Sequence, residues 1–327
     1  MGETLDRRRV ETAKRIEALR GELPRAEQLC GNTACVYMTG SFGRSEASTH
    51  SDLDVFIVGL GTHETPALSR LNQILVKADL IEANKKLGLP EFSADGEYLT
   101  HHTVAELLDT LGKPEDDANN TFTARLLLLL ESTPLVGESA YRRIVDDVIA
   151  SYWRDYQDNR NNFVPAFLAN DILRMWRTFC VNYEARTQSV PAEKRAKRSV
   201  KNYKLKHSRL LTCYSGLLYL LAVFSKNGTV SPTDAASMIA LSPTRRLEWM
   251  LSQPELADAK ETIGKLIGGY ERFLGNTDAS EDELVTRFLD KRRKKEYSDS
   301  AFEFGDLVFA VFNNVGSGNR FHRLLVV

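Results

Sequence analysis

The sequence predicts an α+β protein, with a small mixed β-sheet domain over residues 1–140 and an all-helical domain over residues 141–327. Three observations support this prediction. The length of 327 residues suits about two domains. Short apolar runs typical of strands alternate with helical patterns between residues 31 and 135. Beyond residue 140, β-branched runs are scarce and most segments have helical periodicity.

The expected elements of the first domain follow from apolar periodicity and from glycine breaks. A first helix is expected over 4–29, from an apolar stripe at Val10, Ala13, Ile16 and Leu19. Strands are expected at 34–38, at 52–58, where a long apolar run suits a central strand, and near 97–102. Further helices are expected at 66–87, with the pattern Leu68, Leu71, Ile74, Leu75 and Ala78, and at 104–111 and 121–132.

The second domain is expected to consist of helices separated by short breaks. The expected helical segments are 141–157, 163–187, 199–226, 232–241, 243–251, 255–274 and 280–296. A helical or mixed piece over 300–315 precedes the glycines at 316 and 318.

Charge is divided unevenly between the two halves of the chain. Residues 1–150 hold 16 Lys or Arg and 24 Asp or Glu, a net charge of −8. Residues 151–327 hold 27 and 20, a net charge of +7, so the total of −1 conceals an acidic half and a basic half. A basic half favours partners rich in phosphate.

The sequence also predicts a cytoplasmic protein with no membrane partner. Its N-terminal segment is charged and has no apolar signal region. The most apolar stretch, residues 210–224, is too short for a membrane span and is expected to be a buried helix. The four cysteines form no zinc pattern and are expected to be reduced and mostly buried.

The segment MTGSFGRSEASTHSDLDVFIV, residues 38–58, carries the clearest chemical signal. Asp52 and Asp54 lie two residues apart in an expected strand, so both carboxylates are expected on one face. Neighbouring carboxylates repel unless a cation lies between them. Divalent cations such as Mg²⁺ are held by one or two carboxylates with substrate phosphates, and they assist in-line phosphoryl displacement.

Gly40 and Ser41 supply the complementary half of such a site. They follow an expected strand, and residues 42–47 are expected to open a helix. Backbone N–H groups at a helix start bind phosphate, and glycine allows a close approach. The Ser41 hydroxyl can donate to a terminal phosphate, and Arg44 is expected to neutralise charge on a triphosphate.

This arrangement resembles the nucleotidyltransferase superfamily of DNA polymerase β type. The family signature is a hydrophobic residue, Gly-Ser, a spacer of about ten residues and Asp-hydrophobic-Asp-hydrophobic; here ten residues separate Ser41 from Asp52. The detailed form is most similar to nitrogen-sensor uridylyltransferases and to the minimal nucleotidyltransferases of toxin–antitoxin pairs. These share an Arg after Gly-Ser, a following Glu, and Ser-Asp, here Ser51-Asp52. The surrounding strand–helix pattern extends the resemblance to residues 31–135.

The resemblance implies a set of catalytic and binding residues. The triphosphate would bind at Gly40, Ser41, Arg44 and Ser51, and Asp52 and Asp54 would act in catalysis and hold Mg²⁺ or Mn²⁺.

The family usually has a third carboxylate on a neighbouring strand, which binds metal and activates the acceptor hydroxyl. Glu97, at the head of an expected strand, is the expected catalytic group, and Asp95, in a turn with Gly96, is the alternative as a metal ligand. Asp95 could equally be a plain turn residue, and Glu97 could equally be a carboxylate at the edge of a strand. If neither serves, the site binds nucleotide without transferring it.

Basic segments of the second domain are candidates for contacts with phosphate. Residues 194–209 contain eight Lys or Arg and no acidic residue. Lys204 and Arg209 are the expected nucleotide contacts, and the helical domain as a whole would bind nucleotide or acceptor. The run 291–295 is either solvated surface or a contact with RNA, and 194–209 is also a candidate for RNA.

Two weaker signals have structural and functional interpretations. Near residue 120, helix capping and core packing compete with a role for Asn120 or Arg125 in the nucleotide cleft. In helix 166–182, one face is either solvated or lines the cleft, through Asn170, Arg174 and Arg177.

The sequence therefore predicts a Mg²⁺-dependent nucleotidyltransferase that moves a nucleoside monophosphate, expected to be AMP from ATP, to an acceptor hydroxyl and releases pyrophosphate. The acceptor stays open: a protein side chain, an RNA 3′ end, a small molecule or a second nucleotide. Two alternatives belong to other classes, namely a nucleotide sensor with a degenerate site and an RNA-binding protein whose basic half dominates.

Overall fold

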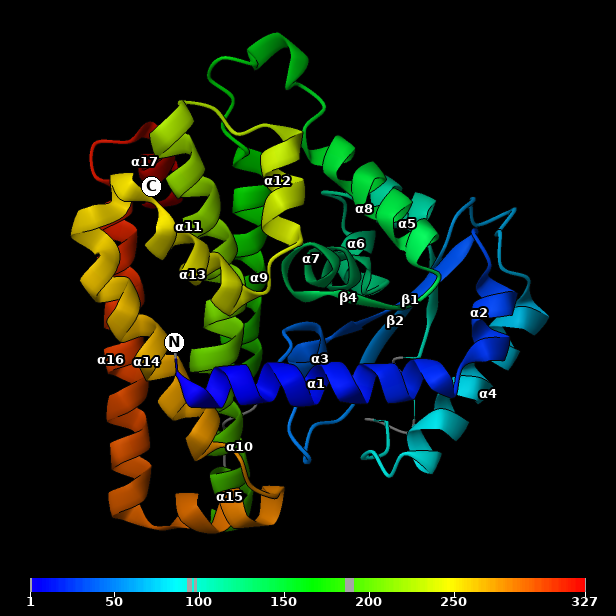
Figure 1. Cartoon of the computed structure of the whole chain (residues 1–327), viewed down its shortest axis with the longest axis horizontal. Helices are drawn as coiled ribbons and strands as arrows, with labels where there is room; N and C mark the ends of the chain where they lie inside the picture. Colours follow the sequence, from blue (N-terminus) through cyan, green and yellow to red (C-terminus); the bar gives the residue numbers. More distant parts are fainter. Residues whose placement is uncertain (1, 93–95, 97–98, 186–190, 327) are drawn as a thin grey trace. The chain divides into compact units, whose positions relative to one another are not determined.

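The structure is a computed structural model that describes residues 2–92, 96, 99–185 and 191–326 (Figure 1). The chain forms two compact units, residues 3–154 and 155–327. The first contains a small mixed β-sheet with helices and the second is helical, so the α+β prediction is confirmed. The division falls after α8 (Glu138–Tyr152) and not at residue 140, because α8 packs against a strand of the sheet.

Four strands form the sheet of the first unit, in the order β3-β2-β1-β4. They are β1 (Ala34–Thr39), β2 (Asp54–Gly59), β3 (His101–Thr103) and β4 (Thr133–Val136). Strand β1 pairs antiparallel with β2 and β4, whereas β2 and β3 are parallel. Strand β2 is an interior strand, and its residues after Asp54 are buried, as the apolar run predicted.

The expected helix over 4–29 is two helices, α1 (Glu3–Gly21) and α2 (Pro24–Cys30). Pro24 stands at the start of α2, where its missing N–H costs nothing, and it cannot continue α1. The buried face of α1 includes Ile16 and Leu19, as expected, but Val10 is 56% exposed.

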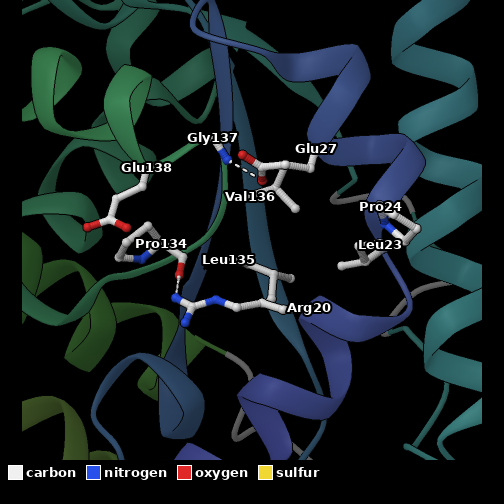
Figure 2. A pocket seen from close by; sticks show the side chains of 9 residues that line it. All are labelled: Arg20, Leu23, Pro24, Glu27, Pro134, Leu135, Val136, Gly137 and Glu138. Atoms are coloured by element: carbon white, nitrogen blue, oxygen red, sulfur yellow. Dashed lines mark hydrogen bonds between the residues drawn. The ribbon is translucent and has the colours of Figure 1, made fainter.

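The sequence did not predict β4, which has four residues and contains Pro134. Proline is tolerated on an edge strand because it donates no hydrogen bond to a neighbour. Figure 2 shows how α1 and α2 cover this edge: Arg20 donates to the Pro134 carbonyl at 2.8 Å, and the Gly137 N–H donates to the Glu27 carboxylate at 3.0 Å. A pocket of about 230 Å³ lies between the two helices and β4, and its lining includes Arg20, Glu27 and residues 134–136 of the strand.

Helix α4 (Arg70–Lys86) forms where expected but buries a different face. The core-facing residues are Val76, Leu80 and Ala83. Leu71 and Ile74, which belong to the apolar pattern used to predict the helix, are 74% and 56% exposed. The apolar pattern predicted the helix correctly, but it marks the exposed side. The buried side carries a separate apolar row, Val76, Leu80 and Ala83, which belongs to the hydrophobic core of the first unit.

Short helices complete the first unit. Helix α5 (Val104–Asp109) begins with a capping box in which Thr103 accepts from the Glu106 N–H and Glu106 accepts from the Thr103 N–H. The others are α3 (Gly40–Gly43), α6 (Glu115–Ala118) and α7 (Thr121–Glu131). Helices α5 and α7 confirm the segments expected at 104–111 and 121–132.

The second unit is built from helices throughout its described residues. They are η2 (Gln157–Asn159), α9 (Ala166–Ala185), α10 (Ala192–Lys204), η3 (Leu205–Arg209), α11 (Leu210–Asn227), α12 (Pro232–Ile239), α13 (Pro243–Ser252), η4 (Pro254–Ala259), α14 (Lys260–Asn276), α15 (Glu281–Leu289), α16 (Lys291–Gly316) and α17 (Arg320–Val326). The expected segment 280–296 is broken at Asp290, whose carboxylate accepts from the Arg293 N–H and so begins α16. The basic run 291–295 therefore opens a helix of 26 residues.

Helices α10, η3 and α11 form one continuous helix, Ala192–Asn227, interrupted by the π-helical turn η3. Within the described part of the chain, this is the one helix long and apolar enough to cross a membrane by length and composition. Its apolar window is 83% buried inside the protein, as expected for a core helix. The four cysteines are free; Cys30, Cys35 and Cys213 are buried and Cys180 is half-buried, so the prediction that most of them are buried is confirmed.

Candidate functional site

The ends of β1 and β2 bring the glycine of the Gly-Ser pair against one of the two aspartates. Thr39 pairs with Asp54 in the last register position of the two strands, and Gly40 follows directly. A Cβ at Gly40 would lie 2.6 Å from the Asp54 Oδ2, closer than side chains tolerate. Gly40 also has a φ of +63°, a conformation that favours glycine. The Asp54 carboxylate therefore packs directly against the backbone of Gly40, where β1 and β2 end.

Asp52 lies in the loop before β2 and not on the strand itself. The paired residues of β1 and β2 end at Thr39 and Asp54, because the chain turns at Gly40. The expectation that both carboxylates project from one face of a strand therefore does not hold, since only Asp54 is a strand residue. Both aspartates are half-buried.

Ser51 shapes the turn that leads into Asp52. Its hydroxyl accepts from the Ser48 N–H at 2.9 Å, and its own N–H donates to the Ser48 carbonyl at 3.1 Å. In this arrangement the Ser51 side chain holds the loop, so its expected contact with nucleotide would require it to serve a second partner.

The helix that begins at Gly40 is a single turn, α3, and residues 44–47 do not extend it. Ser45 has a φ of +62°, which ends the turn. The Gly40 N–H donates to the Glu131 carboxylate at 3.1 Å, and Ser41 is half-buried. The expected helix start over 42–47 is thus wrong, and the turn is fixed by a partner 91 residues away.

Arg44 is held by two buried carboxylates. Its guanidinium donates through Nε to Glu46 and through a terminal nitrogen to Glu131, both at 2.9 Å. All three side chains are at most 8% exposed. Buried charges of this kind must be compensated, and removing one partner is costly. The structure places Arg44 in the support of the Gly-Ser turn, whereas the sequence analysis expected it on a triphosphate.

The backbone beneath the turn is packed too closely for any side chain at Gly43. A Cβ there would lie 2.0 Å from the Glu131 carbonyl oxygen and 2.8 Å from that of Met38. The Thr133 hydroxyl donates to the Gly43 carbonyl at 3.2 Å. The end of α7 and the start of β4 therefore fix the far side of the turn, a constraint that has no signature in the local sequence.

Helix α1 holds the other side of the loop. The Ala47 N–H donates to the Thr12 hydroxyl at 2.9 Å, and the guanidinium of Arg8, which is buried, donates to the Glu46 carbonyl at 3.2 Å. Arg15 donates to the Ser48 carbonyl, and its guanidinium lies 4.8 Å from the centre of the Phe42 ring. Burial lowers the pKa of Arg15 from its usual value. Three side chains spaced along one face of α1 thus position residues 42–48.

The remaining expected site residues are placed as follows. Glu97 and Asp95 lie outside the described residues, so the choice of third carboxylate stays a prediction. Lys204 is exposed at the end of α10, and Arg209 is half-buried in η3, with its guanidinium 5.6 Å from the centre of the Phe179 ring. Both belong to the second unit.

The weaker candidates near residue 120 have structural roles. Arg125 is fully buried and pairs with Asp116 through two hydrogen bonds, at 2.9 and 2.5 Å. It also donates to the Leu107 carbonyl, so it ties α7 to α5 and α6. Asn120 stands at the N-cap position of α7 with a left-handed backbone and no capping hydrogen bond from its side chain. Core packing therefore explains Arg125, and the cleft interpretation of this residue is wrong.

The donors at the candidate site suit a hard cation. The described residues contain no group of three or more His, Cys, Asp or Glu arranged to hold a metal ion. Asp54 offers a half-buried carboxylate against the Gly40 backbone, and Asp52 offers a second half-buried carboxylate two residues earlier, in the loop. Mg²⁺ sites commonly use one or two carboxylates with phosphate oxygens completing the shell. The two aspartates therefore fit a cation that arrives with a phosphorylated substrate.

Comparison with protein-family models finds no match to the chain, and comparison with curated proteins finds none either. Support for a function therefore comes from the residues and their geometry.

Proposed function

We propose that the first unit carries the site of a divalent-cation-dependent nucleotidyltransferase. The observation that supports this most is the meeting of Gly40 and Asp54, with 2.6 Å between Asp54 Oδ2 and the position a Cβ would take at Gly40. The absence of a side chain at Gly40 lets the Asp54 carboxylate pack against the Gly-Ser turn, so a cation bound to Asp54 would hold a phosphate-bearing ligand close to that turn. Asp52 and Ser41 lie within two residues of this point in the sequence.

The polar support behind the turn is what such a reaction requires. Phosphoryl transfer depends mainly on positioning and on charge stabilisation, and little covalent chemistry falls to the protein. The ion pairs of Arg44 with Glu46 and Glu131, together with Thr12 and Arg8 on α1, fix residues 40–48 from two sides. Arg44 in this proposal is a positioning residue that acts through the Gly-Ser turn.

In the proposed reaction, the acceptor hydroxyl oxygen forms a bond to the α-phosphorus of a nucleoside triphosphate. The bond from the α-phosphorus to the bridging oxygen breaks, and pyrophosphate leaves with that electron pair. The hydroxyl proton passes to a carboxylate base, for which Glu97 and Asp95 remain the candidates. Asp52 and Asp54 would hold the divalent cation, which neutralises triphosphate charge and polarises the α-phosphate. The Ser41 hydroxyl would donate to a phosphate oxygen.

The test measures transfer with the full-length protein. Purified protein is incubated with each labelled nucleoside triphosphate and Mg²⁺ or Mn²⁺, with and without cell lysate, and the labelled product is identified by its mass. Asp52→Asn and Asp54→Asn are expected to reduce transfer and pyrophosphate release by at least about 100-fold, because the cation ligands are lost. Asp146→Asn, at an exposed position of α8 in the same unit, is the matched control and should retain activity.

Folding of the variants is checked by thermal unfolding, because Asp52→Asn and Asp54→Asn are nearly isosteric but each removes a half-buried charge. Transfer at the wild-type rate in Asp54→Asn would contradict the assignment. Binding of nucleotide without turnover by the wild-type protein, with every acceptor fraction, would instead favour the sensor alternative.

A further inference from the structure

A second pocket lies within the helical unit, between α14, α16 and the end of α10 with η3. Its volume is about 300 Å³, at the lower end of the range for small-molecule sites. The π-helical turn Leu205–Arg209 passes behind it, and such turns occur frequently at functional sites. The contact of α14 with α16 can be followed in Figure 1.

The inner wall of this pocket is aromatic. The His207 ring stacks on Phe273, with 4.6 Å between ring centres and 6° between planes, and lies 4.7 Å from the Phe304 ring. Tyr203 lies 5.1 Å from Tyr297, which is half-buried and forms part of the lining. Burial lowers the pKa of His207 to about 4, so the inner end is uncharged at neutral pH. Tyr203, His207, Phe273 and Phe304 are at most 4% exposed, so Tyr297 is the ring that a planar group entering this pocket would meet first.

The mouth of the pocket carries charges of both signs and hydrogen-bonding groups. Arg272 on α14 and Arg293 on α16 line it with Glu296 and Glu303, and all four are exposed. Glu296 pairs with Arg292 at 3.1 Å, and neither Arg272 nor Arg293 forms an ion pair with the described part of the chain. The Asn276 amide donates to the Tyr203 hydroxyl at 3.2 Å, which leaves its oxygen as an acceptor beside the aromatic wall. An anionic group and a planar polar ring would therefore both find partners.

The position of Arg293 in α16 strengthens the case for an anion. Residues 291–295 are all Lys or Arg and occupy the first turns of a 26-residue helix. Cations are unfavourable at this end of a helix, because the helix dipole is positive there. Proteins depart from such a local preference mostly at functional sites, so a basic first turn on α16 favours a role in binding an anion.

We propose that this pocket binds a nucleotide, with its base against the aromatic wall and its phosphate held by Arg272 and Arg293. Stacking on aromatic side chains accepts every base, and guanidinium groups bind phosphate in a bidentate manner. The ligand is a free nucleoside monophosphate or one nucleotide of a single-stranded RNA; the chemistry at the pocket is the same. The proposal needs no transfer activity and goes beyond the function proposed for the first unit.

The experiment measures equilibrium binding to the full-length protein in EDTA, which removes any divalent cation from Asp52 and Asp54. The probes are AMP, adenosine, inorganic phosphate and a short single-stranded oligoadenylate. Arg272→Gln and Arg293→Gln are each expected to weaken binding of AMP or oligoadenylate about tenfold, since each removes charge-assisted hydrogen bonds to phosphate. Tyr297→Ala should weaken both ligands but leave phosphate binding unchanged.

The matched control is Lys265→Gln, which removes an exposed charge on α14 that does not line the pocket and lies outside the basic run 291–295. It should change affinity less than about twofold, because a screened surface charge contributes little. AMP binding as tight as oligoadenylate binding would identify a free nucleotide, and tighter oligoadenylate binding with a steep dependence on salt would identify RNA.

Three results would overturn the proposal: no binding of AMP or oligoadenylate, equal affinity for inorganic phosphate and AMP, or an equal loss in Lys265→Gln and Arg293→Gln. The Asp54→Asn variant separates this proposal from that of the first unit, because it should lose transfer and keep pocket binding. Conversely, Arg293→Gln should lose pocket binding and keep transfer, which would show that the two sites act independently.

Discussion

At the scale of single residues, Gly40 is constrained in two ways. Its φ of +63° disfavours any side chain, and the Asp54 carboxylate occupies the space a Cβ would need. Gly88, after α4, has nearly the same φ of +62° but nothing within 4 Å of its Cβ position. The two glycines therefore separate the cost of backbone strain from the cost of displacing a carboxylate.

Gly88→Ala is expected to lower the free energy of unfolding by about 1–2 kcal/mol, since it places alanine in the left-handed region, and Gly40→Ala is expected to lower it by more, since the alanine also displaces the Asp54 carboxylate. Gly40→Ala should also abolish nucleotide transfer, because Asp54 must move. The measurements are urea unfolding and transfer activity of both variants. Wild-type activity in Gly40→Ala would show that the Asp54 position beside the turn is not needed.

Arg44 offers a second prediction at this scale. Arg44→Met leaves the carboxylates of Glu46 and Glu131 buried without their shared cation, so a loss of about 3–5 kcal/mol in the free energy of unfolding is expected. Arg142→Met removes an exposed pair with Glu138 on α8 and should leave stability nearly unchanged. Denaturant unfolding of both variants is the measurement, and similar losses would contradict the account of a buried network.

At the scale of elements, α4 carries two apolar faces of different kinds. Leu80 is fully buried against the sheet, whereas Leu71 is 74% exposed. Leu80→Ala is expected to cost about 2–5 kcal/mol of unfolding free energy, because it leaves a cavity. Leu71→Ala should stay within about 0.5 kcal/mol. Thermal and denaturant unfolding would compare them, and a larger loss at Leu71 would mean that the packed face is the other one.

Element positions were predictable where the signal is local. The strand β2, helices α4, α5 and α7, and the helical second unit all follow from periodicity over adjacent residues. The break at Pro24 is also a local signal, because proline favours the first position of a helix and cannot continue the preceding one. In contrast, four-residue β4 owes its strand state to pairing with β1, about 100 residues earlier, and has no periodicity of its own.

The candidate site divides in the same way. Gly40, Ser41, Asp52 and Asp54 were predicted as site residues from their spacing in the sequence, and the structure shows the close approach of Gly40 and Asp54. Glu131, which binds both Gly40 and Arg44, is remote in sequence and was not identified, and the same holds for Thr12. A buried Arg with two carboxylate partners looks, in sequence, the same as a phosphate-binding Arg, so only the fold separates the two interpretations.

At the scale of the whole molecule, buried histidines make stability depend on pH. Burial lowers the pKa of His207 to about 4, and that of His101 also to about 4, from the usual value of 6.5. Between about pH 6.5 and pH 4 the unfolded chain therefore binds more protons than the folded one. The free energy of unfolding falls as the pH falls through this window, and the effect levels off below about pH 4.

His207→Phe is expected to keep the ring packing against Phe273 and Phe304 while removing one titrating group. The loss of stability between pH 6.5 and pH 4 should then shrink by on the order of 2–3 kcal/mol, since one pKa unit corresponds to about 1.4 kcal/mol. The residual slope belongs in part to His101. Denaturant unfolding at several pH values measures this, and an unchanged slope would place the titration elsewhere.

The covered edge of β4 has a consequence for the protein at high concentration. An uncovered strand edge can pair with a strand of another molecule and start aggregation. Arg20 and Glu27 engage the Pro134 carbonyl and the Gly137 N–H, and so occupy backbone groups that an incoming strand would use. The same two side chains that line a small surface pocket thus block the addition of a foreign strand at the β4 edge of the sheet.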